Sequence, residues 1–211
     1  MAGKSVSTRT ARTRRAITAA AEDQFLASGF LGTSMDEIAA AAQVSKQTVY
    51  SHFQSKEALF LEVVSGMTGG AGDEVLEKVE DPVEETPMET FLLDYAESLL
   101  AIVVTPRLMR LRRLVIGEAE RFPELGKVLH RRGPQRSIDR LSAAFERYMR
   151  AGSLRQADPR VAATTFNWLV MGGPVNDAML LGDEAIPDAS SMSAYANEAV
   201  RVFLAAYGSR P

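Results

Sequence analysis

The sequence predicts an all-α protein with a small N-terminal helical domain and a larger C-terminal one. Three observations support this class. Apolar residues recur at helical spacing along most of the 211-residue chain, helix-start signals separate these stretches, and no strand-like alternation competes with them. With 46% apolar residues, the chain can bury one small and one ordinary core. We expect residues 1–57 to form the first domain and residues 58–211 the second.

The first domain begins with a helix whose inward stripe is Ile17, Ala20, Ala21 and Phe25, preceded by a disordered arm over residues 1–10. A second helix starts at Ser34, because Ser34 and Glu37 have the S-x-x-E spacing of a capping box. Apolar residues then follow at i, i+3, i+4 and i+7, at Met35, Ile38, Ala39 and Ala42.

A third, short helix should run from about Lys46 to Phe53. Ser45 is its N-cap, and Val44 with Val49 can form a hydrophobic staple. Ser55 caps the next helix, whose first turn carries Lys56, and a helix N-terminus beside a cation suits a phosphate.

The short third helix exposes donor-rich side chains. Val49 and Phe53 are four residues apart and must face inward, which leaves the opposite side to Lys46, Gln47, Thr48, Tyr50 and His52. Such side chains suit base edges and phosphates, so the arrangement predicts insertion into a DNA groove. The alternative is an ordinary solvated helix face.

These motifs resemble the DNA-binding domain of the TetR family of bacterial transcriptional regulators. The shared strings are I-x-x-A-A-x-x-x-F-x-x-x-G-F from Ile17, then T-S-x-x-x-I-A, V-S-x-x-T-x-Y-x-H-F and S-K-E-A-L. The resemblance implies a helix-turn-helix DNA-binding domain followed by a helical ligand-binding and dimerisation domain. The segment from Gly117 to Leu125 also resembles part of the AefR-like regulatory domains of that family.

The resemblance also implies which residues meet DNA. Residues matching Lys46, Gln47 and Thr48 approach base edges, whereas those matching Tyr50, His52 and Lys56 hold phosphates. The full predicted DNA-binding set is Thr33, Ser34, Ser45, Lys46, Gln47, Thr48, Tyr50, His52 and Lys56. Gln43 departs from the family, which commonly has glycine in this turn; a left-handed glutamine costs about 1 kcal/mol.

Charge distribution supports nucleic-acid binding although the chain carries a net charge of −3. Residues 1–56 hold seven Lys or Arg against four acidic residues, and the remaining 155 residues have a net charge of −6. Arg9, Arg12, Arg14 and Arg15 form either an arm along the DNA backbone or a solvated tail.

Composition excludes several classes of function. The chain has no cysteine, which removes disulfides, thiolate metal sites and cysteine nucleophiles. Neither a membrane span nor a signal segment is recognisable, so we expect a cytoplasmic protein. We find no metal-ligand cluster and no phosphate-binding loop, and His130 lies in a charged run typical of a solvated face. We therefore predict no catalytic residues, no metal and no cofactor.

The C-terminal domain should consist of helices over about 87–104, 106–120, 123–131, 134–150 and 159–171, a short one after Pro174, and one over 191–207. Thr86-Pro87, Thr105-Pro106 and Asp158-Pro159 mark three of the starts, and Glu89 completes a capping box after Thr86. Glycines at 66, 69, 70 and 72 predict that the helix starting near Lys56 breaks, frays or bends there. The stretch from Glu74 to Glu85 is then its second half or a loop.

Two further sites are predicted in this domain. The resemblance implies an effector pocket, for which the candidate lining residues are Tyr95, Arg112, Phe145, Asn167 and Trp168, with ordinary core as the alternative. Small and apolar residues on the last two long helices predict a four-helix interface between two copies of the chain. The candidate interface residues are Ala162, Thr165, Leu169, Ala199, Val202, Phe203 and Ala206, and packing within one chain is the alternative.

Taken together, the residues predict a homodimeric, sequence-specific DNA-binding regulator. We expect a repressor that is released from a palindromic double-stranded operator by a small apolar or amphipathic effector. The rival interpretations are a ligand-dependent activator, a helical ligand-binding protein without DNA function and, more remotely, an enzyme.

Overall fold

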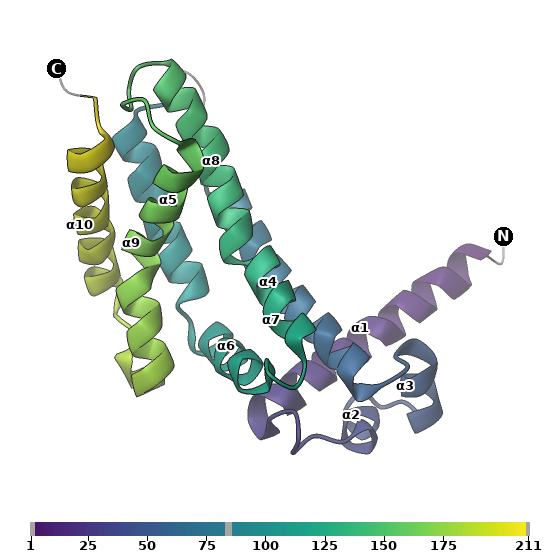
Figure 1. The fold of residues 1–211 in the computed structure, drawn as a ribbon. Coiled ribbons are helices and arrows are strands. Elements are labelled where there is room, and N and C mark those ends of the chain that lie inside the picture. The colour runs from purple at the N-terminus through teal and green to yellow at the C-terminus, as the bar shows by residue number, and fades with distance from the viewer. Residues whose placement is uncertain (1–2, 83–85, 210–211) are drawn as a thin grey trace. The chain divides into compact units, whose positions relative to one another are not determined.

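Ten α-helices and one short 3₁₀ helix make up the computed structural model, which describes residues 3–82 and 86–209, with side chains from Arg9 onward. No strand occurs in these ranges; Leu154 and Gly208 form an isolated bridge. The expected all-α class is confirmed (Figure 1). The elements are α1 (Gly3–Ser28), α2 (Met35–Ala41), α3 (Lys46–His52), α4 (Lys56–Lys78), α5 (Met88–Val103), α6 (Pro106–Glu118), α7 (Pro123–Arg132), α8 (Pro134–Arg150), α9 (Pro159–Leu181), η1 (Asp183–Ala185) and α10 (Ala189–Tyr207).

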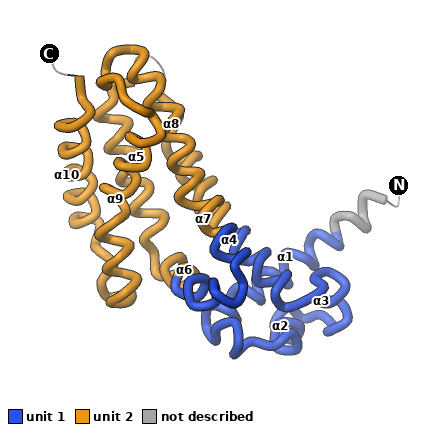
Figure 2. The backbone as a smooth tube through the Cα atoms, viewed as in Figure 1, with its two compact units in different colours: residues 1–67, 113–128 blue, residues 68–112, 129–211 orange. Residues whose placement is uncertain are grey.

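The chain divides into two compact units, coloured in Figure 2. The N-terminal unit contains residues 1–67 and 113–128, and the C-terminal unit contains residues 68–112 and 129–211. The sequence motif predicts a single domain boundary after residue 57. The N-terminal unit of the structure extends to residue 67 and also includes residues 113–128. The divisions fall inside α4, α6 and α7, so each of these helices contributes residues to both units.

The first helix is longer than the sequence motif indicates. It begins at Gly3, whereas the sequence predicts a disordered arm over residues 1–10, of which residues 1 and 2 lie outside the described range. No proline or glycine interrupts the chain between Gly3 and Gly29, and a helix once nucleated extends until such a residue ends it. It ends at Gly29, which has φ 75°.

The predicted start signals of α2 and α3 are both present. Ser34 accepts a hydrogen bond from the backbone N–H of Glu37 (3.2 Å), and the Glu37 carboxylate accepts one from the backbone N–H of Ser34 (2.8 Å). These bonds hold the pKa of Glu37 below its usual value. Ser45 accepts from the backbone N–H of Thr48 at 3.0 Å. The capping box and the N-cap therefore set where the two short helices begin.

The turn between α2 and α3 contains a left-handed residue at the position where the family commonly has glycine. Gln43 has φ 54° and is the only non-glycine residue with positive φ in the described backbone. Its neighbour Val44 donates its N–H to the Ala39 carbonyl at 3.0 Å, which closes the end of α2.

Replacing Gln43 by glycine should raise the free energy of unfolding by about 0.5–1 kcal/mol, because the strain relieved exceeds the entropy that glycine adds to the unfolded chain. Urea unfolding followed by circular dichroism measures the change. Gln47→Gly is the matched control, since Gln47 is exposed and helical, and it should lower stability by about 1 kcal/mol. A less stable Gln43→Gly variant would show that the turn is not strained.

The α4 helix is continuous through its glycines, so of the expected alternatives at residues 66–72 a break does not occur, and the helix runs on to Lys78. Arginine side chains explain two of the glycines. A Cβ atom at Gly69 would lie 2.9 Å from Nη1 of Arg132, and one at Gly72 would lie 3.0 Å from Nη1 of Arg136. Arg136 also donates to the Gly69 carbonyl (3.4 Å) and to Asp73 (2.7 Å). Packing of these side chains along α4 offsets the low helix propensity of glycine.

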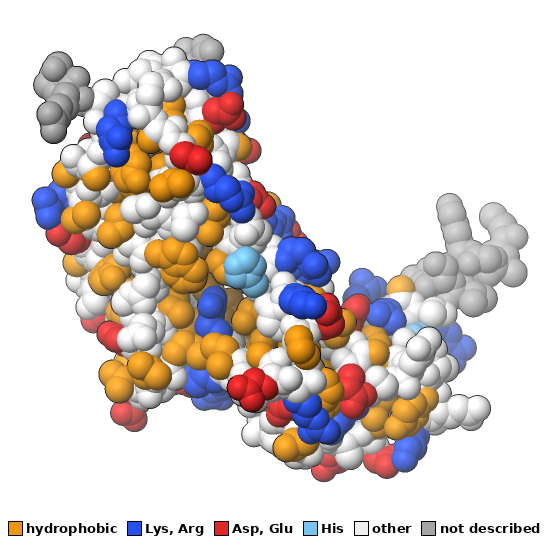
Figure 3. All heavy atoms as spheres, viewed as in Figure 1, with side chains coloured by type: hydrophobic (Ala, Val, Ile, Leu, Met, Phe, Trp, Pro, Cys, Tyr) orange, Lys and Arg blue, Asp and Glu red, His pale blue; other side chains and the backbone are white. Residues whose placement is uncertain are grey.

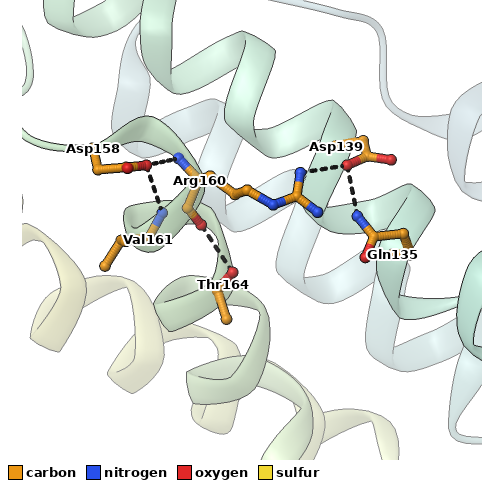
Figure 4. Close-up of polar contacts among 6 residues, drawn as sticks. All are labelled: Gln135, Asp139, Asp158, Arg160, Val161 and Thr164. Atoms are coloured by element: carbon orange, nitrogen blue, oxygen red, sulfur yellow. Dashed lines mark hydrogen bonds and ion pairs between the residues drawn. The ribbon is translucent and has the colours of Figure 1, made fainter.

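The C-terminal unit packs α8, α9 and α10 around an aromatic cluster formed by Phe145, Phe166 and Phe203. Their ring centroids lie 5.0–6.1 Å apart, and all three side chains are fully buried. Figure 4 shows how α9 is fastened at its start. Asp158 accepts from the backbone N–H groups of Arg160 and Val161, as the Asp-Pro signal predicts.

The Arg160 guanidinium reaches Asp139 of α8 at 2.8 Å, and Gln135 donates to the same carboxylate oxygen (Figure 4). The hydrogen bond from Arg160 is the main reason that the pKa of Asp139 lies below its usual value.

One predicted helix end and one predicted capping box in this unit are wrong. The α9 helix continues through Pro174 to Leu181, although proline removes a backbone hydrogen bond. Buried residues on both sides of Pro174, such as Val170 and Ala178, keep the two halves packed on one core. The α5 helix begins at Met88 without a side-chain cap. The carbonyl of Thr86 instead accepts a hydrogen bond from the Tyr148 hydroxyl at 3.1 Å. A contact with a distant helix therefore positions Thr86, and the local capping signal does not.

Candidate functional site

The exposed face of α3 is the first candidate site. Val49 is fully buried and Phe53, which follows the helix, is nearly so, and both hold α3 against the core of the N-terminal unit. The opposite face presents Lys46, Gln47 and Tyr50 to solvent, with 44% of Tyr50 exposed. The hydrogen-bond donors of these three side chains are therefore open to solvent and available to a binding partner.

Lys46 is held by a neighbour on α2. Its ammonium lies 2.8 Å from the Asp36 carboxylate, and both side chains are more than half exposed. The hydrogen bond to Asp36 raises the pKa of Lys46. Exposed pairs of this kind contribute about 0–1 kcal/mol, so a phosphate or a base edge can compete for the ammonium.

Thr33 and Ser34, at the start of α2, have structural contacts. Thr33 is buried, and its hydroxyl lies 2.8 Å from the Gly29 carbonyl and 3.1 Å from the Gln24 carbonyl. Ser34 takes part in the capping box described above. Both residues therefore fix the loop that places the N-terminus of α2.

Lys56 lies at the start of α4 and is partly buried. Its ammonium donates to the carbonyls of Phe30 and Thr33, each at 2.8 Å, and lies 4.4 Å from the centroid of the Phe30 ring. The sequence predicts a phosphate contact here. The structure adds that two of the three donors of Lys56 fasten the loop between α1 and α2 to α4.

Arg14 has a role that the sequence does not reveal. Sequence analysis places it in a basic arm, but its guanidinium donates to the His52 carbonyl (3.2 Å), pairs with Glu62 (3.0 Å) and covers the Phe53 ring at 4.2 Å. It therefore fastens the end of α3 to α1 and α4. Arg9, Arg12 and Arg15 are exposed on the same helix and remain free of such contacts among the described residues.

A cavity within the C-terminal unit is the second candidate site. Its walls come from α4 to α9 and are largely apolar. Four of the five predicted ligand residues line it: Tyr95, Arg112, Asn167 and Trp168. Phe145 does not line it and lies instead in the aromatic cluster. The Tyr95 hydroxyl donates to Ser137 at 3.0 Å, and burial raises the pKa of this tyrosine, which stays neutral. An apolar cavity with a few polar groups is the usual form of a small-molecule site.

The predicted interface residues fall into two groups. Ala162, Ala199 and Phe203 are buried within one chain, Thr165 and Leu169 are partly buried, and Val202 and Ala206 are exposed. Other apolar side chains on α9 and α10 are exposed as well: Val161 (56%), Trp168 (46%) and Tyr195 (38%). Figure 3 shows hydrophobic side chains gathered on the face of the C-terminal unit where α9 and α10 lie. Clustered exposed apolar side chains are typical of a surface that is covered by a partner.

Other kinds of site have little support in the described residues. No group of three or more His, Cys, Asp or Glu side chains there could hold a metal ion. None of the helices described has both the length and the apolar character to cross a membrane.

Two family models match the chain, one over each domain. Residues 17–63 match the family model for bacterial regulatory proteins of the tetR family, and residues 90–209 match the model for the C-terminal domain of AefR-like transcriptional repressors. No curated protein is significantly similar to the chain.

Among solved structures, a TetR-family regulator from Mesorhizobium loti is 36% identical, covers 95% of this chain and 98% of its own, and superposes with a TM-score of 0.88. The flavonoid-responsive regulator FrrA is 30% identical, covering 95% of this chain and all of its own, with a TM-score of 0.77. A TetR regulator from Agrobacterium tumefaciens is 27% identical over 94% of this chain and 95% of its own, with a TM-score of 0.78.

Proposed function

Because the chain belongs to the TetR family of bacterial transcriptional regulators, we propose that it is a homodimeric repressor that leaves a palindromic operator when a small effector enters the C-terminal cavity. Members of the family are regulators rather than enzymes. They bind DNA, typically as dimers, and respond to ligands. The dimer, the palindrome, the cytoplasmic location and the residue roles below are our proposals for this chain.

The observation that carries the proposal is the exposed face of α3. With Val49 buried on one side, Lys46, Gln47 and Thr48 at its N-terminal end face outward toward base edges, and Tyr50 and His52 one turn later reach phosphates. The other predicted DNA-binding residues mainly position the interface, because their polar groups fix the starts of α2, α3 and α4. These residues are Thr33, Ser34, Ser45 and Lys56.

Selection of bound duplexes from a random DNA pool tests the proposal. The expected product is a palindrome whose half-sites are spaced by about one helical turn, because two symmetry-related copies of α3 read successive major grooves. Recovery of no enriched sequence at low ionic strength, where phosphate contacts are strongest, would contradict it.

Effector control requires a path from the cavity to α3, and we propose α6 for it. This helix lines the cavity with Leu108, Leu111 and Arg112, and its continuation belongs to the N-terminal unit. There Phe122 meets the Phe30 ring edge to face at 5.0 Å, and Phe30 stacks on Phe60 of α4 at 5.2 Å. A ligand that binds the DNA-free arrangement more tightly would shift the population toward it through these contacts.

Phe122→Ala should therefore weaken the coupling. We expect the effector concentration needed for half-release from operator DNA to rise about tenfold, while effector affinity without DNA stays within twofold, because the cavity is unchanged. Fluorescence anisotropy of labelled operator, read beside direct effector binding, measures both quantities. The control is Pro123→Ala, at the neighbouring exposed position. A Phe122→Ala variant with normal release would exclude this path.

A further inference from the structure

The cavity in the C-terminal unit is unusually cationic for an apolar site. Four arginines line it, at positions 112, 132, 136 and 140, and no aspartate or glutamate is among its lining residues. The other walls are mainly aliphatic and include Leu99, Val103, Leu108, Met171 and Val175. Positive charge beside buried aliphatic surface is unfavourable unless something compensates it.

Two of these arginines are compensated within the chain. Arg136 pairs with Asp73, and Arg140 pairs with Asp81 at 2.8 Å and donates to the Val79 carbonyl. Arg132 is exposed to solvent, which compensates its charge. Arg112 is different, because it is partly buried and none of the described residues accepts a hydrogen bond from it or pairs with it. Burial without an acidic partner lowers the pKa of Arg112. The guanidinium stays charged at neutral pH, so the protein holds a partly buried cation without an acidic partner.

Two more donors at the cavity lack acceptors. The side-chain amide nitrogen Nδ2 of Asn167 and the Nη1 nitrogen of Arg140 are both buried, and neither has a hydrogen-bond partner among the described residues. Asn167 is 2% exposed and lies on α9, next to the cavity-lining Trp168. Buried donors are almost always paired in proteins, so unpaired ones that converge on one cavity indicate a missing acceptor.

We propose that the effector is an amphipathic anion, whose apolar body fills the aliphatic part of the cavity and whose acidic oxygens accept hydrogen bonds from Arg112 and Asn167. This inference rests on the proposed repressor function for its biological role. A guanidinium and an anionic oxygen form a charge-assisted hydrogen bond, which is stronger than a neutral one and stronger still away from water. A neutral molecule of the same shape without acceptor oxygens leaves the donors unpaired, so the cavity should discriminate against it.

The test uses two fluorescent probes with the same aromatic body. One is 1-anilinonaphthalene-8-sulfonate, an anion, and the other is N-phenyl-1-naphthylamine, its neutral counterpart. Trp168 is the only tryptophan of the chain and lines the cavity, so energy transfer from it reports probe bound near the cavity, and the Arg112 variants assign that probe to the site. The full-length protein should bind the sulfonate at least tenfold more tightly than the amine through this site.

Arg112→Met removes the charge and keeps the length of the side chain. It should weaken sulfonate binding about tenfold or more and leave amine binding unchanged or tighter. Its melting temperature without ligand should rise, because an uncompensated buried cation is replaced by an apolar side chain. Arg112→Lys keeps the charge and should retain a preference for the sulfonate. Arg150→Met is the control, since Arg150 is exposed on α8 and does not line the cavity.

Equal sulfonate affinity in the native protein and Arg112→Met would overturn the proposal, as would tighter binding of the neutral amine by the native protein. If Arg112→Met loses both probes through misfolding, Arg112→Lys decides, and a lysine variant without preference for the sulfonate refutes it. None of these measurements involves DNA. If the operator selection fails but the probes bind as expected, the proposed effector role is wrong. The anion site is still supported in that case.

Discussion

Replacing Val161 and Val202 together by glutamate is expected to convert the protein to a monomer and to lower its affinity for the palindromic operator about 100-fold or more. Both side chains are exposed apolar groups on α9 and α10, where a partner copy would bury them. Two carboxylates in such an interface lose their hydration without gaining a partner. The loss of DNA affinity follows because linking two half-site contacts in one dimer multiplies affinity by about 10²–10⁴.

Sedimentation velocity gives the oligomeric state, and gel shift on the selected operator gives the affinity. A control must carry the same added charge, because two extra acids also repel DNA. Ala101→Glu with Ala151→Glu serves this purpose, since both alanines are exposed in the C-terminal unit but lie outside α9 and α10. If the Val161/Val202 variant stays dimeric, or is monomeric with normal operator affinity, this face is not the functional interface.

Substitutions on α3 should separate general from sequence-specific binding. Tyr50→Ala is expected to weaken binding to the operator and to unrelated duplexes by a similar factor of about 10, because Tyr50 is proposed to hold a phosphate. Gln47→Ala should lower discrimination between the operator and a variant base pair by about 10–100-fold, because Gln47 is proposed to read a base edge. Both residues are exposed and outside the core, so the fold should be unaffected.

Competition gel shifts with operator, single-base variants and random duplex measure both effects at one fixed salt concentration. Gln54→Ala, an exposed glutamine just after α3, is the matched control and should change neither quantity. Unaltered non-specific binding by Tyr50→Ala would exclude its phosphate role. If Gln47→Ala binds all duplexes more weakly but discriminates between them as before, Gln47 contacts the DNA backbone and does not read a base.

The start signals of the short helices were predictable because they are local. Ser34, Glu37 and Ser45 act on backbone groups within three residues, so their spacing alone determines the caps that the structure shows. The burial of Val49 and Phe53 was predictable for the same kind of reason, since helical periodicity decides which residues share a face. The exposed side of α3 follows from these two local rules.

Contacts between distant segments were not predictable from pattern. The sequence shows Arg14 as one of four basic residues and Lys56 as a cation near a helix start. Only the fold brings Arg14 to the His52 carbonyl and Lys56 to the carbonyls of Phe30 and Thr33. Phe145 is predicted to line the cavity but packs in the aromatic cluster. Helical spacing does not show whether an aromatic residue faces a cavity or the core.

By itself, the sequence determined the all-α class, the helix-turn-helix motif and its outward face, and the family, because each depends on interactions within a few residues or on motifs at fixed spacing. Tertiary structure alone decided that α4 passes through its glycines, that α9 passes through Pro174, and that Arg112 lies uncompensated in an apolar cavity. In each of these cases, packing between segments far apart in the sequence outweighs local propensity or sets local charge, and no short pattern encodes such contacts.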